Sequence, residues 1–592
     1  MTRTNWNFSL RGSWIAVLLL ASAGCAPSDR GDPQADLVLR NGTVATVAEG
    51  RSEALADALP EAPAEAQAVA MRGPWIVAVG SDEDIEPWIG PDTEVIDLAG
   101  RRAVPGFIEG HGHFLSLGRA KTILDLTKAR TWEDIVAMVA EAAADVEPGE
   151  WISGRGWHQE KWDRPPSPAI DGSPVHASLS AVSPDNPVLL GHASGHAAFA
   201  NAKAMKLAGL TRDSENPPGG ELVRDASDEL TGLLRETAQR IVSRVRSRSR
   251  EGRSAEEVEA EMRRFVELAS QDVLSKGVTS FHDAGSSFGD IDFFKQLEAA
   301  GELPVRLYVM VRGESNEQMD ELLPRYRMIA DGNDFLTVRS IKRQIDGALG
   351  SHGAWLLEPY SDMPESVGLV LEPEDDIRGT AEVAIKHGFQ VNTHAIGDRA
   401  NRAVLDIYQE VFEANGSPAD LRWRIEHAQH LHPDDVPRFA ELGVIASMQG
   451  VHCTSDGPWV PDRIGDRRAA QGAYVWRSLL EHGVVINNGT DVPVEDIDPI
   501  ANFYATISRR TNTGELFYPE QRLTREEALR SYTLNGAYAA FEEDLKGSIE
   551  PGKLADIVVL SQDIMTIAED EIPATRVDTT ILGGEIRYQR AE

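Results

Sequence analysis

The chain has 592 residues, 42% hydrophobic and 26% charged, which is enough apolar material for a large core shared among two or three structural units. Its 94 acidic and 58 basic residues give a net charge of −36, which argues against nucleic acid or anionic lipid as a partner, because phosphate attracts the opposite charge. Two cysteines cannot form a disulfide framework, and we expect Cys453, which has no obvious base partner, to be a small buried side chain rather than a nucleophile.

The N-terminus has the features of an export signal. Residues 1–25 combine a positively charged start with an apolar run from Trp14 to Ala21, which is too short to cross a bilayer of roughly 30 Å as a helix. The four residues from Ser22 to Cys25 (SAGC) resemble a bacterial lipobox with a lipidated cysteine, although leucine is usual at the first position; the alternative is an ordinary secretory signal cleaved near Ala23. We expect an exported, lipid-anchored protein, periplasmic or associated with the outer membrane, with a flexible tether at residues 26–35.

Short strand patterns occur at both ends of the mature chain. They are Asp36–Gly42, Ala68–Val79 and Glu94–Leu98 near the start, and Gly547–Leu560 and Val577–Tyr588 near the end. An Ala/Glu/Pro-rich surface loop separates the first two. The sequence therefore predicts one small composite β-sandwich domain, formed by residues 36–103 and 545–592.

The middle of the chain alternates apolar strands with helical patterns. The candidate strands are Val104–Ile108, Val278–His282, Val305–Val311, Leu336–Ile345, Phe389–His394, Arg422–His427, Val444–Met448 and Val484–Asn488. Eight such repeats predict an α/β fold, a (β/α)8 TIM-like barrel, over residues 104–544.

The first two candidate strands are about 170 residues apart, much more than a normal loop, so we expect residues 115–265 to form an insertion over the barrel mouth. A helix in this insertion carries a basic run that we expect to face solvent: Arg244, Arg246, Arg248 and Arg250.

Metal-binding side chains recur where the barrel strands end. His111 and His113 follow the first strand with the i, i+2 spacing that points two side chains of an extended segment the same way, toward one cation. Later strands end at His394, His427 and Asp491. Active sites of such barrels lie at the C-terminal ends of the strands, so this order predicts a metal site there.

At this point the chain resembles the amidohydrolase superfamily, and within it the YtcJ-like branch. The resemblance runs from about Asp36 to Tyr588. Its motifs are PGFIEGHGHF, GHASGHAAFAN, GVTSFHDAG, SIKRQIDGALGSHGAWLLEPYS, VNTHAIGDRAN, RIEHAQH, NNGTDVPV and the terminal GSIEPGKLADIVVL.

The resemblance implies a role for each candidate metal-site residue. It implies metal ligation by His111, His113, His394 and His427, and it implies that Asp491 touches the metal and shuttles protons. We expect one or two ions, with zinc as the default metal. Such a cation lowers the pKa of bound water from about 15.7 to about 7 and polarises the scissile carbonyl.

Lys342 matches a lysine that is carbamylated in several branches of the superfamily and bridges two metals. This role requires a neutral amine, because an ammonium repels a cation. If Lys342 is unmodified, we expect it to pair with Asp346, two residues further along the same strand face. Gln344 departs from the resemblance, because an apolar or aromatic residue is usual there.

Other candidates lie in the insertion and on the second strand. His192 and His196 are in a segment that resembles a substrate-side loop, and we expect them to bind substrate; helix capping near Asn201 is the alternative. The cluster of Trp151, Trp157 and Trp162 near His158 fits either the pocket mouth or the packing of the insertion. We expect His282 and Asp283 to support the metal ligands from behind.

These features predict a metal-dependent hydrolase that cleaves an amide-type C–N bond of a small N-acyl or N-formyl compound. Asp491 would take a proton from the attacking water and give it to the leaving nitrogen. A lactone or ester hydrolase and a deaminase remain alternatives, because the same site would serve them. A non-catalytic exported binding lipoprotein is disfavoured, since no ligand position is replaced. We expect the partner to be a small-molecule substrate and not nucleic acid. We expect contact with a membrane only through the lipid anchor, and we allow for a homodimer.

Overall fold

The computed structural model describes residues 34–48, 62–170, 172–330, 334–418 and 420–591. The predicted signal peptide and all but Gln34 and Ala35 of the predicted tether lie outside the described residues. Among the helices that are described, none has the length and hydrophobicity needed to cross a membrane.

Eight parallel strands form the central sheet, which confirms the predicted TIM-like barrel. In chain order they are β8 (Phe107–Gly112), β17 (Val278–Ser286), β18 (Arg306–Val311), β19 (Leu336–Gln344), β20 (Gln390–Ala395), β21 (Arg424–His427), β22 (Ile445–Met448) and β23 (Ile486–Asn488). Each strand pairs with the next in sequence, from β8 to β23. The ends of the sheet approach each other where Asn487 Nδ2 donates to Gly110 O at 3.1 Å and Asp491 N donates to His111 O at 2.8 Å.

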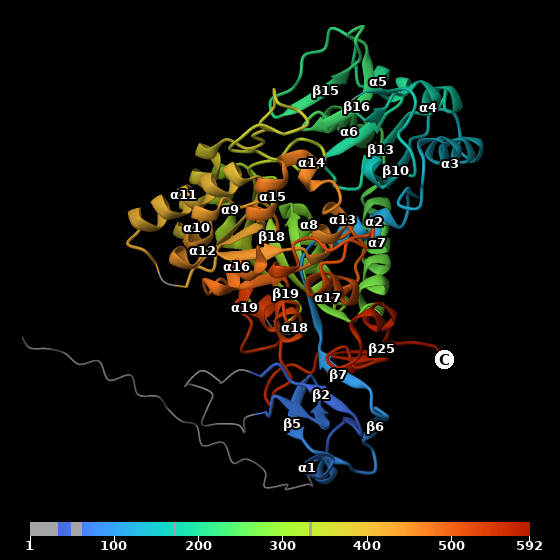
Figure 1. The fold of residues 1–592 in the computed structure, drawn as a ribbon. Coiled ribbons are helices and arrows are strands. Elements are labelled where there is room, and N and C mark those ends of the chain that lie inside the picture. The colour runs from blue at the N-terminus through green and yellow to red at the C-terminus, as the bar shows by residue number, and fades with distance from the viewer. Residues whose placement is uncertain (1–33, 49–61, 171, 331–333, 419, 592) are drawn as a thin grey trace, which may run out of the picture.

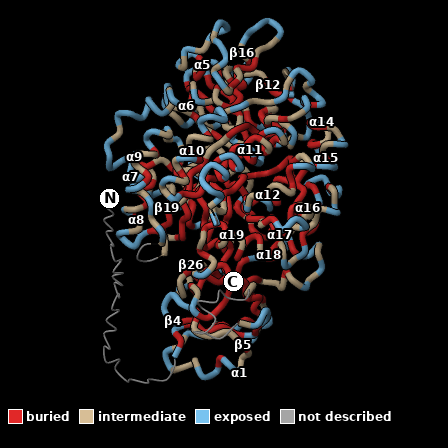
Figure 2. Tube along the Cα trace, turned by 90° about the vertical axis from the view of Figure 1, so that its left-hand side faces the viewer, coloured by how far each residue is buried: buried red, intermediate tan, exposed pale blue. Residues whose placement is uncertain are grey.

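Helices surround this sheet and bury its apolar outer side chains. They include α7 (Ala255–Ser275), α8 (Phe288–Ala299), α9 (Asn316–Tyr326), α10 (Glu374–His387), α11 (Asp398–Ala414), α12 (Val436–Leu442), α16 (Trp476–Glu481), α17 (Pro499–Ser508), α18 (Arg525–Ser531) and α19 (Leu534–Ala539). Local sequence fixes where they begin: Ser254, Ser287 and Ser315 form capping boxes at α7, α8 and α9. The centre of the molecule is almost continuously buried (Figure 2).

The two chain ends form a small β domain below the barrel, drawn in blue and dark red in Figure 1. One sheet contains β5 (Trp75–Gly80), β4 (Ala68–Arg72), β1 (Leu37–Arg40) and β6 (Glu94–Asp97). The other contains β26 (Glu585–Gln589), β25 (Val577–Leu582), β24 (Ile557–Leu560), β7 (Arg102–Pro105), β2 (Thr43–Ala45) and β3 (Glu65–Ala66). Side chains from both sheets share one apolar core, as a sandwich requires.

The predicted first barrel strand, Val104–Ile108, is wrong in one respect, because the chain changes sheets within it. Val104 lies in β7 and pairs with Val558 of the small domain, whereas Ile108 lies in β8 and pairs with Ser280 of the barrel. Gly106 makes the crossing: a Cβ there would lie 2.2 Å from Thr279 Oγ1, so only glycine fits this close approach. The crossing joins the small domain directly to the strand that carries the first histidines.

The insertion lies at the opposite end of the barrel from the small domain (Figure 1). Its sheet contains β9 (Leu124–Asp125), β10 (Ile152–Trp157), β13 (Val188–His192), β14 (Ala197–Ala200), β16 (Leu230–Glu236) and β15 (Gly220–Arg224). Its helices are α3 (Trp132–Asp145), α4 (Ala177–Val182), α5 (Ala202–Leu207) and α6 (Gln239–Arg248). The preceding α2 (Phe114–Ala120) packs against α7, where a Cβ on Gly118 would lie 1.9 Å from Phe265 O.

Candidate metal centre

The six predicted metal-site residues come from five barrel strands or the turns that follow them. They are His111 in β8, His113 directly after β8, Lys342 in β19, His394 in β20, His427 at the end of β21 and Asp491 beyond β23. All six line one cavity of about 480 Å³ between the strand ends and the insertion. The structure therefore brings together residues that are up to 380 positions apart in the sequence, as His111 and Asp491 are.

Three of these side chains offer ligand atoms at mutual distances that suit one cation. One ligand atom from each of His111, His427 and Asp491 lies within 4.8 Å of the others. His113 adjoins them, with Nε2 3.2 Å from Asp491 Oδ1. The His394 ring is next to His427, with a distance of 4.4 Å between ring centroids. A mixed set of imidazole and carboxylate ligands at this spacing is typical of zinc and related divalent metals.

The charge states of these groups fit a metal. Burial lowers the pKa of His111 to about 4, and it lowers the pKa values of His394 and His427 well below the ordinary histidine value. Burial opposes ionisation of Asp491, but the hydrogen bond from His113 lowers the pKa of this carboxyl, which lies well below its usual range. The cluster therefore presents neutral imidazoles and an ionised carboxylate, which are the forms that bind a cation.

Neighbouring side chains orient the imidazoles. His111 Nδ1 lies 2.5 Å from Glu426 Oε2, and His427 Nδ1 lies 2.8 Å from Gln449 Oε1, so each ring points its Nε2 away from these contacts. His394 Nε2 is buried and makes no hydrogen bond among the described residues, although Asp346 Oδ1 lies 3.5 Å away. Unpaired buried nitrogen is costly, and a cation at the cluster would satisfy it. The donor set therefore fits a divalent metal.

The backbone at two of these positions is in an uncommon conformation. His427 has φ 76° and Asp491 has φ 58°, both in the left-handed region that side chains other than glycine seldom adopt. Asp491 is held there by its N–H, which donates to His111 O at 2.8 Å. Strained residues of this kind concentrate at functional sites, where the surrounding structure fixes them.

Lys342 lies among the ligands, with Nζ 3.2 Å from His111 Nε2. Burial lowers its pKa to about 8, so about a tenth of the amine is neutral at pH 7, far more than for an ordinary lysine. The alternative pairing with Asp346 is wrong: that carboxylate accepts hydrogen bonds from the N–H groups of Trp355, Ile396 and Gly397 at 2.8–3.0 Å, and no ion pair joins it to Lys342. Asp346 fixes the loops beside the site instead.

The two histidines of the insertion differ in their surroundings. His196 lines the cavity, and its Nδ1 lies 2.8 Å from Glu236 Oε2. Burial alone would lower the pKa of His196, but Glu236 raises it above the ordinary value. His192 instead borders a smaller adjoining cavity, and both ring nitrogens are engaged, Nδ1 with Ser194 Oγ at 2.8 Å and Nε2 with Gln159 Oε1 at 3.1 Å.

Four other residues singled out in the sequence have structural environments. Trp157 is buried in the core of the insertion and donates to Leu190 O at 2.9 Å, so packing accounts for it. Asp283 accepts from Phe114 N at 2.9 Å, next to His113, and thus supports the turn that carries this histidine. His282 lies outside the cavity with Nδ1 3.1 Å from Arg424 Nη1. Burial raises the pKa of the Cys453 thiol to about 11, which suits a structural cysteine.

Sequence patterns did not single out several residues of this site. Glu426 and Gln449 hold two histidines, and the only signal for Glu426 is that it directly precedes His427 at a strand end. The expectation that the α6 arginines all face solvent is wrong for Arg246, which lines the cavity. Four further arginines line it too: Arg119, Arg155, Arg240 and Arg312.

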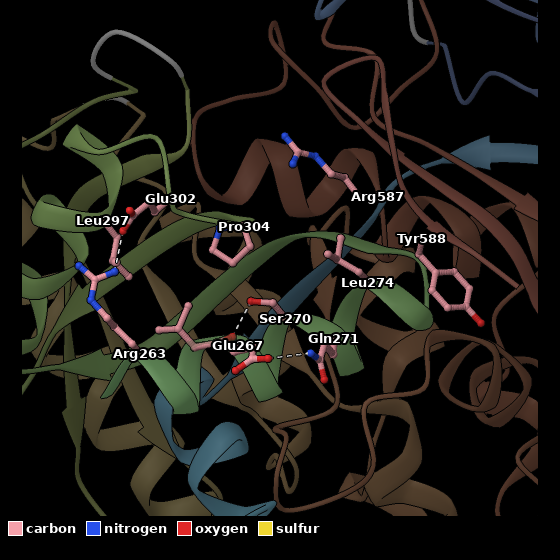
Figure 3. A pocket seen from close by; sticks show the side chains of 11 residues that line it. Arg263, Glu267, Ser270, Gln271, Leu274, Leu297, Glu302, Pro304, Arg587 and Tyr588 are labelled. Atoms are coloured by element: carbon pink, nitrogen blue, oxygen red, sulfur yellow. Dashed lines mark hydrogen bonds and ion pairs between the residues drawn. The ribbon is translucent and has the colours of Figure 1, made fainter. Parts of the chain in front are cut away.

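A hollow of about 600 Å³ elsewhere on the molecule is larger than the metal-site cavity but lacks its chemistry. It lies between α7 and β26 (Figure 3). Its charged side chains are engaged with neighbours, such as Arg263 Nη1 with Glu302 Oε2 at 2.6 Å and Gln271 Nε2 with Glu267 Oε1 at 3.2 Å. The candidate site is therefore identified by its converging metal-binding side chains and not by the volume of its cavity.

A parallel eight-stranded barrel with imidazole and carboxylate ligands converging at its strand ends defines a metal-dependent hydrolase. The model of the amidohydrolase family matches residues 94–588, and the chain belongs to this family.

Named relatives agree with this assignment. The chain is 29% identical to "Putative amidohydrolase YtcJ" of Bacillus subtilis, covering 89% of this chain and 96% of the relative. It is 28% identical to "N-substituted formamide deformylase" of Arthrobacter pascens, covering 89% and 95%. A solved structure of an uncharacterized metal-dependent hydrolase from Pyrococcus horikoshii is similar with a TM-score of 0.68 and 26% identity, covering 90% of this chain and 99% of that one. The predicted resemblance to the YtcJ-like branch is thereby confirmed.

Proposed function

We propose that this enzyme uses zinc to hydrolyse an amide-type C–N bond in a small N-acyl or N-formyl compound. The observation that carries the proposal is the convergence of His111, His427 and Asp491 within 4.8 Å at the floor of a substrate-sized cavity. The relative from Arthrobacter pascens, whose name describes an N-substituted formamide deformylase, supports the choice of a C–N bond.

In the proposed site His111, His113, His394, His427 and Asp491 hold the metal. When bound, the metal supplies acidification of water and polarisation of the substrate carbonyl. Asp491, whose pKa lies well below its usual range, is ionised, accepts the proton of the attacking water and delivers it to the leaving nitrogen. Its fixed backbone keeps the carboxylate in place for both transfers.

His196 is proposed as the group that binds the substrate carbonyl. Because Glu236 favours its protonated form, this ring presents an N–H to an oxygen that gains negative charge during the reaction. The ring lies close to His394, with 5.2 Å between centroids, so the donor is next to the metal ligands.

Lys342 is proposed to be carbamylated. Its neutral Nζ forms a bond to the carbon of CO2 and releases a proton, which gives a carbamate whose oxygens add ligands for one or two ions. The lowered pKa and the position of Nζ beside His111 support this step. An intact-mass measurement of native protein, in which carbamate adds the mass of one CO2, tests it against Lys342→Met.

A second, smaller cavity limits the acyl group. It has a volume of about 50 Å³, adjoins the first at His394, His427 and Asp491, and is lined in part by Leu349 and Trp459. We place a small acyl group, such as formyl or acetyl, in this smaller cavity and the rest of the molecule in the larger one. His192 borders the smaller cavity, where we place its contact with the acyl group.

The test is metal analysis of purified protein followed by a substrate screen. Formamides, N-acyl amino acids and lactones are compared with and without chelator, and zinc is then added back. We expect amide cleavage that is lost on chelation and restored by zinc. Activity that survives complete metal removal, or cleavage of lactones but not amides, would contradict the proposal.

Export with a lipid on Cys25 is proposed from the N-terminal sequence alone. Metabolic labelling with a fatty acid should mark the wild-type protein and not Cys25→Ser, while an exported but unlabelled wild type would favour the ordinary signal. A homodimer is tested by light scattering of the mature protein, with a monomeric mass as the contrary result.

A further inference from the structure

Five arginines line the cavity that holds the metal ligands, in a protein whose net charge is −36. They come from separate segments: Arg119 in α2, Arg155 in β10, Arg240 and Arg246 in α6, and Arg312 directly after β18. The cavity thus combines cationic side chains from the barrel and the insertion.

None of the five arginines has a carboxylate within 4 Å among the described residues. Arg155 donates to two backbone carbonyls, Ala193 O at 2.9 Å and Pro493 O. Arg246 Nη1 donates to Ser153 Oγ at 3.1 Å, and Arg312 donates to Gln344 Oε1.

Two arginines outside the cavity, both more deeply buried than the five, are paired with carboxylates, although the equally buried Arg509 is held by backbone carbonyls alone. Arg102 has Asp563 at 2.8 Å and Arg306 has Asp556 at 2.8 Å. Buried charges are normally paired, because an unpaired ion loses its hydration without compensation. The cavity arginines are instead partly exposed and have no carboxylate partner, so they are open to an anionic ligand in the cavity.

Nearby protein groups do not neutralise the outer part of the cavity. Burial and the neighbouring Arg119 and Arg250 lower the pKa of Arg246 to about 10. Glu261, whose field favours the charged form of Arg119, is already held by Arg250 at 2.6 Å and by Arg253 at 2.8 Å. Arg119 and Arg246 therefore form a pair of mutually repelling cations, which we call the outer pair.

The other arginines are nearer to the reacting centre. The charge of Asp491 raises the pKa values of Arg155 and Arg312, whereas it is not among the groups that shift the pKa values of the outer pair. Gln344, the residue that departs from the family resemblance, accepts a hydrogen bond from Arg312 and so fixes the direction of this guanidinium. The cavity thus has a cationic outer end, separated from the position of the scissile bond.

We propose that the substrate is an anion whose carboxylate, or another oxyanion such as phosphate, binds the outer pair Arg119 and Arg246 while its acyl group lies at the metal. This inference rests on the proposed amide hydrolysis only for the position of the scissile bond. It narrows the substrate class to N-acyl compounds with an acidic group on the amine side, such as N-acyl amino acids. Guanidinium groups suit this recognition, because they bind oxyanions with paired N–H donors.

The first experiment compares substrates that differ only in charge. N-formyl and N-acetyl derivatives of ω-amino acids of increasing chain length are assayed beside their carboxamides, with the zinc-loaded enzyme. We expect kcat/KM to be at least about tenfold higher for the acid at the best length, since a charge-assisted hydrogen bond changes affinity by about tenfold to a hundredfold. Equal kcat/KM for every acid and its carboxamide would overturn the proposal and leave amide hydrolysis intact.

Variants then assign the preference to the outer pair. Arg119→Gln and Arg246→Gln should raise KM for the acid by about tenfold or more with kcat little changed, and should leave the carboxamide unaffected. Arg248→Gln is the matched control, because Arg248 is in the same last turn of α6 but is exposed. An unchanged preference in both outer-pair variants would overturn the assignment.

A binding measurement separates this proposal from amide hydrolysis. Inorganic phosphate and N-acetylglycine should raise the unfolding midpoint of the wild type and of Arg248→Gln, and not of Arg246→Gln. Without ligand, Arg246→Gln should unfold at the same or a higher temperature, because the variant removes like-charge repulsion; a purely structural arginine would give the opposite. If no amide is cleaved but this pattern holds, the anion site is supported and the proposed reaction is rejected. If neither anion shifts the wild type, the anion site is rejected.

Discussion

Glu426 offers the sharpest test of the metal centre, because it touches only one candidate ligand. Its Oε2 lies 2.5 Å from His111 Nδ1, and neither group is exposed to solvent. In Glu426→Gln the amide oxygen still accepts the Nδ1 proton, so the ring keeps its tautomer, but the negative charge that makes Nε2 a stronger donor is lost. Removing such a partner weakens metal binding by about 10- to 100-fold, which is about 1.4–2.8 kcal/mol.

The assay is competition for zinc between the enzyme and a chromophoric chelator of known affinity, with wild type and variant side by side. Glu441→Gln is the control, because this substitution removes the same charge from an exposed position at the end of α12. Unfolding of the metal-free proteins shows whether the variant folds. A folded Glu426→Gln that binds zinc as tightly as wild type would refute the view that His111 is a ligand oriented by this carboxylate.

Three further predictions concern the ligands and the lysine. Asp491→Asn should lower kcat by about 10²- to 10⁴-fold while most of the metal is retained, and wild-type kcat in this variant would remove its role in proton transfer. His394→Ala should lose zinc and activity together, so a fully metallated His394→Ala would show that His394 is no ligand. Reactivation of chelated enzyme by zinc at fixed dissolved CO2 should be about tenfold faster at pH 7 than at pH 6, because the neutral fraction of Lys342 rises about tenfold per unit below its pKa of about 8; a pH-independent rate would contradict carbamylation.

The barrel and the position of the centre were predictable because both depend on local pattern. Each barrel strand is a short apolar run, and β20 and β21 carry histidine near their C-terminal ends. In a parallel barrel all such ends face the same rim, so chain order alone predicts convergence. The exception is the crossing at Gly106, where one continuous apolar run serves two sheets. Periodicity cannot detect a change of sheet, because both halves remain extended and buried.

The partners of the ligands were not predictable in this way. Gln449 reaches His427 from just beyond the next strand, and Asp346 is held by the N–H groups of Trp355 in its own loop and of Ile396 and Gly397 after β20. These contacts depend on loop geometry, which leaves no periodic signal in the sequence. The supposed pairing of Lys342 and Asp346 failed for this reason: Asp346 lies beyond the end of β19, and backbone N–H groups from outside the strand satisfy its carboxylate.

The net charge of the chain also does not predict the charge of the substrate. A total of −36 argues against large polyanionic partners, because their many phosphates sense the whole surface. A small anion inside a cavity senses mainly the groups near it, since at physiological salt the field of exposed charges decays over about 8 Å. The groups that line this cavity include the outer pair Arg119 and Arg246, which have no carboxylate within 4 Å among the described residues. The acidic surface and an anionic substrate are therefore compatible, and only the fold, which brings α2 and α6 to one cavity, reveals the local sign.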